Sequence, residues 1–320
     1  MHVDRILLVS LDNLGDMVFA SALAPPLRER FPRMKLDVWC KEYTADIAKL
    51  VPHVSDVIAS DPFWDRAPGR GKGARRPFLR AVRFVRSRRY DVAVLAAAPW
   101  RTAAAVAATR IPVRIGLRRR KNRIFLTQAL PDENPRAPVL SELARLLEPL
   151  GAASGPLRYR LDASSLAARQ AHLAAIVRQP YAALHPFASK ENRCVPLPVW
   201  IDVSRRLAER RLTVLWIGSR QELTTLRAAG NESSWRFIDR DSDGTLADTA
   251  AALSAARIFV GHDSGPLHIA GAFGVPVVGV FAPGEPLRTF PQGVGPWRML
   301  ARPSPAGITA DDILREVDAL

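Results

Sequence analysis

Short apolar runs alternate with amphipathic segments along almost the whole chain. In the first half, apolar runs at residues 6–9, 35–39, 56–59 and 91–96 predict buried strands. Helical spacing at residues 17–31, 43–50, 78–89 and 141–150 predicts helices, the first of them in spite of Pro25 and Pro26. In the segment 78–89, the apolar residues expected to face a core are Leu79, Val82, Phe84 and Val85. This alternation predicts a doubly wound α/β domain.

The same pattern restarts in the second half of the chain. Strands are predicted at 181–185, 213–218, 237–238, 258–260 and 277–281, and helices at 166–178, 198–210, 221–229, 246–255, 266–273 and 309–320. We therefore predict two Rossmann-like domains, residues 1–155 and 156–320, joined by a glycine-containing connection that begins near residue 151. The last helix, which opens with Thr309 and Asp312 at capping-box spacing, can pack back on the first domain. Ligands are expected in a cleft that faces the carboxyl ends of both sheets.

The stretch 257–283 forms the clearest local unit of the sequence. Two apolar runs flank a helix whose start is marked by Asp263, Ser264, Gly265 and Pro266. Free backbone N–H groups and the positive end of a helix dipole favour an anion such as phosphate at that point. The alternative interpretation is that Asp263 or Ser264 merely caps the helix.

The formal net charge of +15 is the unusual feature of the composition. It favours acidic partners: nucleic acid, an anionic membrane, or phosphorylated or carboxylated substrates. The basic residues gather in two stretches, 65–89 and 110–123, which form either a solvated cationic face or a cationic cleft wall or membrane-facing rim. Nucleic acid is disfavoured, because these stretches lack interleaved aromatic residues.

Other features of the sequence bear on the cellular compartment in which the protein is expected. No apolar run approaches the roughly 18–20 residues of a membrane span, and a strand begins almost at once, so we expect no signal peptide. Cys40 and Cys194 are far apart and lack metal-ligand spacing. We therefore expect a reduced, cytoplasmic protein that carries no resident cofactor.

Three loops that follow predicted strands could carry chemistry. In the loop 10–16, Asp16 could accept a proton from a hydroxyl group, or could simply cap a helix. In the loop 185–193, Ser189, Lys190 and Arg193 suit a diphosphate, with an ordinary surface loop as the alternative. After a third strand, Glu222 could accept hydrogen bonds from ribose hydroxyls.

Several other chemistries are disfavoured. Neither a G-x-G-x-x-G motif nor a phosphate-binding G-x-x-x-x-G-K-[ST] loop occurs, which argues against dinucleotide redox and ATPase chemistry. The acidic residues of 239–243 fit a turn before a helix better than a divalent metal site. No pair of histidines has metal-ligand spacing, so we predict no metal site.

Taken together, these stretches resemble glycosyltransferase family 9, the ADP-heptose:lipopolysaccharide heptosyltransferases. The family's signature D-[TS]-G-P-x-H-x-A-x-A-x-G-x-P is matched by Asp263, Ser264, Gly265, Pro266, His268, Ala270, Ala272, Gly274 and Pro276. The N-terminal ILLVSLDNLGD and the segment 90–117 are similar to two further family segments. The resemblance implies a GT-B fold and inverting, metal-independent glycosyl transfer.

The resemblance also implies roles for single residues. Asp16 would be the general base, and Asp263 would hold donor-sugar hydroxyls, with His268 beside it as a donor contact or a packed structural residue. Ser264 and Gly265 would bind the diphosphate through backbone N–H groups. Further donor contacts would come from Ser189, Lys190, Arg193 and Glu222.

The chain departs from the family pattern mainly in its first half. Ser10 stands where Lys or Arg is usual, and Asp12 and Asn13 stand where small hydroxyl residues are usual, while residues 96–98 are all alanine. In the second half the departures are Val195 and Ala282. The acceptor is therefore less well indicated than the donor.

We expect heptose transfer from ADP-heptose to an acidic saccharide such as lipopolysaccharide inner core, at the cytoplasmic membrane face. Acceptor contacts are predicted at Asn13, Arg101, Arg118 and Arg120. The alternatives are transfer to a small natural product, a nucleotide-sugar epimerase of similar fold, and a non-catalytic binder of nucleotide sugars or membranes.

Overall fold

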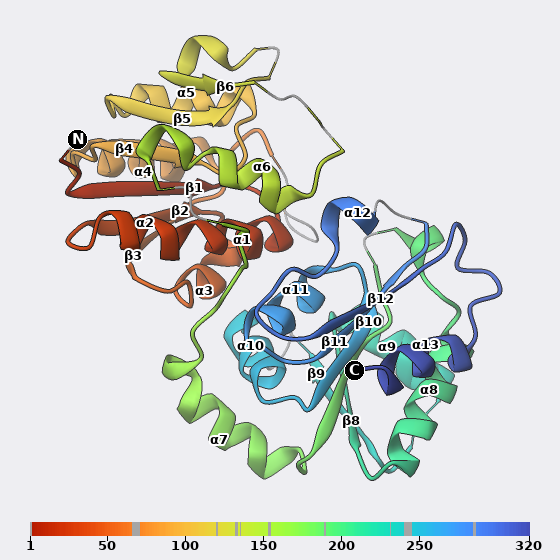
Figure 1. Cartoon of the computed structure of the whole chain (residues 1–320). Coiled ribbons are helices and arrows are strands. Elements are labelled where there is room, and N and C mark those ends of the chain that lie inside the picture. Colours follow the sequence, from red (N-terminus) through yellow and green to blue (C-terminus); the bar gives the residue numbers. More distant parts are fainter. Residues whose placement is uncertain are drawn as a thin grey trace. The chain divides into compact units, whose positions relative to one another are not determined.

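The computed structural model describes residues 2–65, 71–119, 121–131, 134, 136–152, 155–188, 190–230, 232–239, 245–283 and 286–320. The chain divides into two compact units, Met1–Tyr159 and Arg160–Leu320. Each unit contains one six-stranded parallel sheet with helices on both faces (Figure 1), so the predicted pair of doubly wound α/β halves is confirmed.

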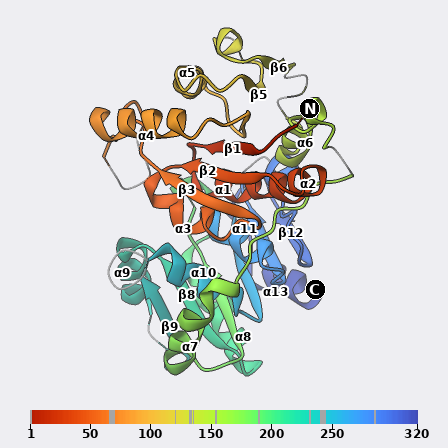
Figure 2. The ribbon, with the colours of Figure 1, turned by 90° about the vertical axis from the view of Figure 1, so that its left-hand side faces the viewer.

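The first sheet has the strand order β3-β2-β1-β4-β5-β6. Its strands are β1 (Arg5–Ser10), β2 (Lys35–Cys40), β3 (Val54–Ala59), β4 (Val92–Leu95), β5 (Val113–Leu117) and β6 (Gln128–Leu130). The helices are α1 (Leu14–Ala20), α2 (Ala24–Arg30), α3 (Ala45–Ala48), α4 (Arg75–Ser87), α5 (Trp100–Ala108) and α6 (Val139–Arg145). Figure 2 shows α4 and α5 on one face of this sheet and α1, α2 and α6 on the other.

The core of the first unit follows from the alternation of side chains along β1. Leu7 and Val9 point to the face covered by α4 and α5, where they join Phe78 and Val85 in one buried cluster. Successive strand residues face opposite sides, so the buried Ile6 and Leu8 serve the other face. The sheet is therefore apolar on both sides, as a doubly wound sheet requires.

Helix α4 corrects the expectation for its core face. Phe78, Ala81 and Val85 are its buried residues, and Val82 is partly buried. Leu79 and Phe84, predicted to face the core, are 47% and 46% exposed. The helix starts at Arg75, earlier than predicted, and in it Phe78, Ala81 and Val85 share a face at spacings of three and four residues.

The predicted single helix at residues 17–31 is two helices separated by a 3₁₀ turn, Ser21–Leu23. Proline has no backbone N–H, so Pro25 and Pro26 cannot donate the hydrogen bonds that a continuous helix requires. Proline is tolerated in the first turn of a helix, and the start of α2 at Ala24 places both prolines there.

The second sheet has the order β12-β11-β10-β7-β8-β9. Its strands are β7 (Tyr181–His185), β8 (Thr213–Gly218), β9 (Trp235–Asp239), β10 (Ile258–His262), β11 (Val277–Phe281) and β12 (Trp297–Ala301). The helices are α7 (Ala167–Ile176), α8 (Leu197–Glu209), α9 (Arg220–Ala229), α10 (Leu246–Ser254), α11 (Gly265–Ala272), α12 (Pro286–Thr289) and α13 (Ala310–Asp318). Figure 1 shows α7, α10 and α11 on one side of the sheet and α8, α9 and α13 on the other.

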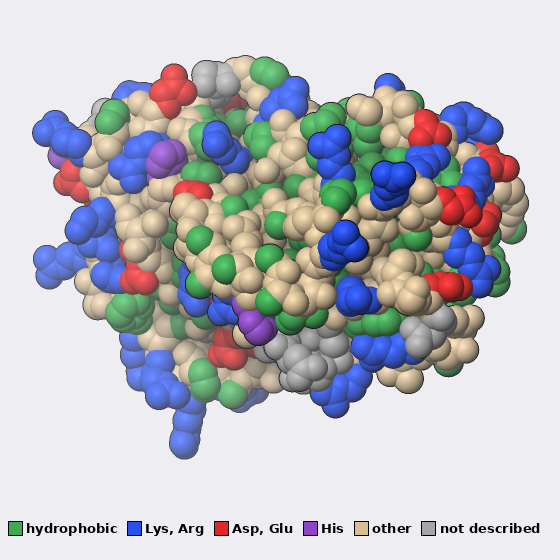
Figure 3. Space-filling model, turned by 90° about the horizontal axis from the view of Figure 1, so that it is seen from below, with side chains coloured by type: hydrophobic (Ala, Val, Ile, Leu, Met, Phe, Trp, Pro, Cys, Tyr) green, Lys and Arg blue, Asp and Glu red, His purple; other side chains and the backbone are tan. Residues whose placement is uncertain are grey.

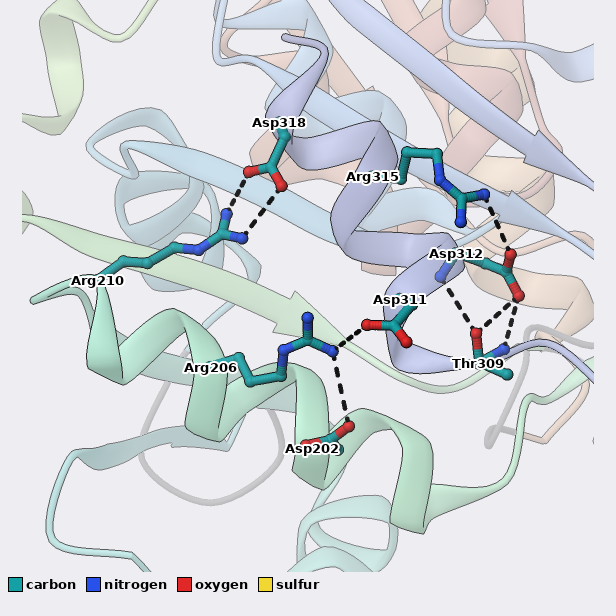
Figure 4. Close-up of polar contacts among 8 residues, drawn as sticks. All are labelled: Asp202, Arg206, Arg210, Thr309, Asp311, Asp312, Arg315 and Asp318. Carbon is teal, nitrogen blue, oxygen red and sulfur yellow. Dashed lines mark hydrogen bonds and ion pairs between the residues drawn. The ribbon is translucent and has the colours of Figure 1, made fainter.

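The last helix, α13, packs within its own unit, against α8, β11 and β12. Ile313 and Leu314 are fully buried there, and Thr309 caps the helix by accepting the N–H of Asp312, as the capping-box spacing predicted. Arg206 of α8 and Arg210, the residue that follows α8, bind carboxylates of α13 (Figure 4). Arg206 donates to Asp311 at 2.5 Å, and Arg210 donates to Asp318 at 2.6 Å.

Among the described residues, five helices and strands have no counterpart among the predictions: α5, α12, β5, β6 and β12. The helix α5 is rich in alanine and has little amphipathic contrast. The strands β5 and β6 pair at one edge of the first sheet, and β5 carries an arginine inside a short apolar run. The strand β12 closes an edge of the second sheet and begins with two exposed residues, Trp297 and Arg298. Edge strands with one open side lack the continuous apolar run that marks a buried strand.

Lysine and arginine side chains are spread over the face drawn in Figure 3, and acidic side chains are fewer. Within the described part of the chain, no helix is both long and apolar enough to cross a membrane.

Candidate functional site

The loop that follows β1 places Asp16 at the start of α1. Asn13 has extended backbone angles at the N-cap position, and the Asp16 carboxylate accepts the N–H of Asn13 at 3.2 Å. This bond satisfies one of the donors left open at a helix start. Asp16 therefore does cap the helix, as the alternative interpretation held, but only one of its carboxylate oxygens is used for that bond.

Asp16 is also chemically distinctive. Burial disfavours the charged form and raises the pKa of its carboxyl from 3.8 to about 7, and the negative charge of Asp12 adds to the effect. A carboxylate with a pKa near neutrality is a stronger base than an ordinary aspartate and is still ionised in part at physiological pH. The site can therefore accept a proton from a hydroxyl group.

Tyr43 and Lys41 complete the polar surroundings of this loop. The Tyr43 hydroxyl donates to Asn13 Oδ1 at 3.4 Å, and burial raises the pKa of Tyr43. Lys41 lies at the carboxyl end of β2, is 2% exposed, and pairs with Asp65 at 2.6 Å. Neither Tyr43 nor Lys41 could be singled out from the sequence, because their proximity to this loop depends on how β1 and β2 pair.

The predicted acceptor residues are placed on several elements of the first unit. Asn13 is exposed beside Asp16, and Arg101 is exposed on α5, stacked on Trp100 with 5.1 Å to the ring centre. Arg118 is exposed directly after β5, where its N–H bonds the carbonyl of Leu130. Arg120 lies outside the described residues.

In the second unit, the helix predicted within the stretch 257–283 is α11. Ser264 has extended angles at its N-cap, and Pro266 lies in its first turn. The Ser264 hydroxyl is buried and has no hydrogen-bond partner among the described residues. The N-terminal N–H groups of Gly265 and its neighbours lie where an anion is favoured.

The Asp263 carboxylate is held by two side chains. Thr289 donates to Oδ2 at 3.1 Å, and His268 Nε2 lies 3.5 Å from Oδ1. His268 is 3% exposed, so it supports Asp263 from inside the unit, in keeping with the packed alternative. Asp263 stays partly exposed, with 22% of its side chain open, and can accept hydrogen bonds from hydroxyl groups.

His262 has a structural role that the sequence did not reveal. Its Nε2 accepts the N–H of Val195 at 3.0 Å, and its Nδ1 lies 3.3 Å from the carbonyl oxygen of Val280. Burial lowers the pKa of His262 to about 4, so the ring is neutral and carries its proton on Nδ1. His262 thereby ties the loop before α8 to the carboxyl ends of β10 and β11.

That loop carries the predicted phosphate contacts. Arg193 lies partly buried at the edge of a shallow hollow, whose lining is completed by Ala188, His262, Asp263 and residues 280–283. Within the described ranges Arg193 has no ion-pair partner, so its charge is available to an anion. Lys190 is exposed nearby in the sequence, and Ser189 lies outside the described residues.

Glu222 is engaged in a capping box at the start of α9. Its Oε2 accepts the N–H of Ser219 at 2.7 Å, and its own N–H lies 3.4 Å from the Ser219 hydroxyl. Its position after β8 is as predicted, and its second carboxylate oxygen is not used by the cap.

Among the described residues, no group of three or more His, Cys, Asp or Glu side chains is placed to hold a metal ion. Of the acidic turn 239–243, residues 240–243 lie outside the described part of the chain.

The fold matches solved glycosyltransferases over their whole length. A Veillonella parvula structure of glycosyl transferase family 9 matches with a TM-score of 0.84 and 15% identity, covering 100% of this chain and 98% of that one. The Escherichia coli ADP-heptose LPS heptosyltransferase II matches with 0.81 and 20% identity, covering 98% of both chains. Heptosyltransferase WaaC of the same organism, solved with ADP-2-deoxy-2-fluoro heptose, matches with 0.76 and 19% identity, covering 98% of this chain and 99% of that one.

These matches show a two-domain, GT-B-like α/β fold. The model of glycosyltransferase family 9 (heptosyltransferase) matches residues 78–301, which is more than half of the chain. The match includes β7 to β11 and the Asp263 region, and it agrees with the resemblance read from the motifs. The chain therefore belongs to glycosyltransferase family 9 and is a glycosyltransferase.

Proposed function

We propose that this enzyme transfers heptose from ADP-heptose to an acceptor hydroxyl with inversion of configuration at the anomeric carbon. The observation that carries the proposal is the Asp16 carboxylate, which is partly buried after β1 and has a pKa of about 7. The donor groups of the second unit supply the complementary chemistry, a set of anion-binding N–H groups and cations.

In the proposed step, the acceptor oxygen attacks the anomeric carbon while Asp16 takes the hydroxyl proton. The bond between that carbon and the diphosphate oxygen breaks, and its electron pair leaves with the nucleoside diphosphate. A single displacement of this kind inverts the anomeric configuration. Removal of the proton by Asp16 at the moment of attack avoids a charged oxonium product, which is what a general base contributes.

The second unit is proposed to hold the donor. Asp263, oriented by Thr289 and His268, accepts hydrogen bonds from sugar hydroxyls. The N–H groups at Ser264 and Gly265 take the diphosphate, together with the cations of Arg193 and Lys190 and the hydroxyl of Ser189. The Glu222 oxygen outside the capping box accepts from the ribose.

The donor assignment has support from the structural relatives. Heptosyltransferase WaaC was solved with ADP-2-deoxy-2-fluoro heptose, and its fold covers nearly all of this chain. Arg193 and the start of α11 are chemically suited to a diphosphate, since fixed cations and backbone N–H groups stabilise the charge of the leaving group. We propose that transfer needs no metal ion or cofactor, so activity should survive chelation by EDTA.

The acceptor is proposed to be an acidic saccharide, such as lipopolysaccharide inner core, met by a cytoplasmic enzyme at the inner membrane face. The exposed arginines of α4 and Arg118 give the first unit a cationic surface suited to phosphates, carboxylates or anionic lipid. Asn13, Arg101 and Arg120 are further proposed acceptor contacts. Binding to vesicles that contain anionic lipid should weaken as salt is raised.

A donor panel and one pair of variants test the proposal. ADP-heptose should raise the unfolding temperature more than other nucleotide sugars, because a ligand that binds only the folded state stabilises it. Asp16→Asn should lower transfer by about 10²–10⁴-fold, the usual share of a general base, and should keep the donor-induced shift. The control Asp46→Asn alters a partly exposed carboxylate of α3 and should transfer normally.

Two outcomes would contradict this assignment. Protection by a different nucleotide sugar, without protection by ADP-heptose, would overturn the donor. Interconversion of the nucleotide sugar in the absence of any acceptor would show an epimerase.

A further inference from the structure

The carboxylates of Asp12 and Asp16 accept a hydrogen bond from the same backbone N–H group. The N–H of Asn13 is 3.0 Å from Asp12 Oδ1 and 3.2 Å from Asp16 Oδ2, so two carboxylate oxygens converge on one hydrogen. The negative charge of Asp12 raises the pKa of the Asp16 carboxyl. Two ionised carboxylates that converge on one N–H group repel each other, and one proton held by the pair removes that repulsion.

The charges around the pair favour the retention of that proton. Lys41 is 2% exposed, and its positive charge acts on both carboxylates. Its ammonium group is already paired with Asp65 at 2.6 Å. Three carboxylates thus share one ammonium group, and a held proton relieves part of the excess negative charge.

The remaining titratable neighbours do not supply a second cation. Tyr43 lies against the pair through Asn13, and burial together with the charges of Asp16 and Asp12 raises its pKa, which keeps its hydroxyl neutral. Asp61, whose charge also acts on Tyr43, accepts the N–H of Glu42 at 3.0 Å and adds negative charge.

We propose that Asp12 and Asp16 form a carboxylate pair that shares one proton, in which Asp12 is a positioning residue that makes Asp16 a stronger base. The inference deepens the proposed function and rests on Asp16 being the base of that reaction. It assigns Asp12 no contact with the substrate: Asp12 acts through Asp16.

The carboxylate pair accounts for the uptake of the acceptor proton by Asp16 and for its later release to water. In the reactive form the shared proton has passed to water, both carboxylates are ionised, and their repulsion raises the affinity of Asp16 for a proton. When Asp16 takes the acceptor proton, its new O–H donates to the Asp12 carboxylate, which remains ionised and stabilises the protonated form. After the nucleoside diphosphate has left, loss of that proton to water restores the reactive form.

The first test needs no substrate. Carboxyl carbons of ¹³C-labelled aspartate, assigned with the Asp12→Asn and Asp16→Asn variants, should titrate in two steps that appear at both residues, as coupled groups do. Independent single-step titrations at Asp12 and Asp16 would overturn the pair. This measurement stands even if the enzyme transfers a different sugar or none.

The second test uses the pH dependence of transfer. In Asp12→Asn, Asp16 loses a neighbouring negative charge, so the acidic limb of the rate profile should move to lower pH by about one unit. The rate at high pH should fall several-fold, since a base of lower pKa is weaker. Asp12→Glu should restore the wild-type limb in part, and the Asp46→Asn control should leave it in place.

The outcomes separate the two proposals. Suppose that the acidic limb of the pH–rate profile does not move in Asp12→Asn, and that Asp16→Asn is inactive. That result would exclude the proposed role of Asp12 and would retain Asp16 as the base. A two-step titration in an enzyme whose Asp16→Asn variant transfers normally would keep the pair and remove the proposed function of Asp16.

Discussion

Asp16 links stability and chemistry at the scale of a single residue. Its folded pKa of about 7 lies above its ordinary value of 3.8, so the folded state holds this proton more tightly than the unfolded chain does. The stabilising effect is complete below pH 4 and is lost as the pH rises through 7. Above that pH the ionised side chain opposes folding.

Asp16→Asn should therefore unfold at a higher temperature than the wild type at pH 8, with a gain on the order of 1–3 kcal/mol after allowance for partial exposure. The amide oxygen can still accept the N–H of Asn13. The gain should vanish at pH 4, where Asp16 is protonated. If the wild type and Asp16→Asn had equal free energies of unfolding at both pH 8 and pH 4, ionisation of Asp16 would not destabilise the folded state.

Gly261 is required by the close packing of β10. A Cβ at this position would lie 2.7 Å from the carbonyl oxygen of His185 and 2.8 Å from the ring of Phe259. The first neighbour is backbone in the centre of the sheet and has no room to move. Gly261→Ala should therefore lower the free energy of unfolding by roughly 1–3 kcal/mol.

Gly71→Ala is the matched control, because a Cβ there meets no atom within 4 Å. Denaturant unfolding of both variants would check the comparison. A loss in the control as large as that in Gly261→Ala would point to a general effect of alanine and not to a clash.

At the scale of the elements, α13 shows which kind of contact holds a helix in place. Its ion pairs with α8 are exposed, with side-chain exposures of 38% for Arg210 and 59% for Asp318. Exposed pairs contribute about 0–1 kcal/mol. The side chain of Ile313 is fully buried, and its removal from water contributes more free energy than an exposed ion pair does.

Ile313→Ala should therefore cost about 2–5 kcal/mol of unfolding free energy, and Asp318→Ala less than about 1 kcal/mol. Thermal unfolding in low and high salt would distinguish them, since only the ion pair is screened. A larger loss for Asp318→Ala would show that the salt links, and not the core, fix α13.

The elements also show how far the sequence could lead. Buried strands such as β7, β8 and β11 were predicted with their observed bounds, because a short apolar run between turn residues is typical of a strand buried on both faces. The edge strand β12, with exposed residues at its start, has no such run. The break between α1 and α2 depends on where the two prolines fall in a helical turn, which the apolar pattern does not specify.

The same limit applies to the candidate site. Asp16 and Asp263 could be picked out because each follows a predicted strand and begins a helix. Their partners could not. The convergence of Asp12 and Asp16 on the N–H of Asn13 depends on the turn of one loop, and the hydrogen bond between His262 and Val195 joins residues 67 positions apart. A single sequence does not indicate which residues that are far apart in the chain come into contact.

At the scale of the whole molecule, the proposed donor groups all lie in the second unit and the proposed base in the first. Binding of ADP should slow backbone hydrogen exchange chiefly in the loop 190–195 and at the start of α11, since a bound ligand stabilises the elements that contact it. Exchange mass spectrometry with and without ADP would measure this. Protection centred on β1 to β3 would place the nucleotide in the wrong unit for the proposal.

The position of the boundary between the two units has a consequence for the design of chimaeric enzymes. The chain passes between the units once, between Tyr159 and Arg160, and each unit has its own sheet and buried cluster. A crossover there severs no strand or helix, so chimaeras with other members of the family should fold. Exchange of the first 159 residues would then change the proposed acceptor half while the proposed nucleotide-binding half is inherited intact.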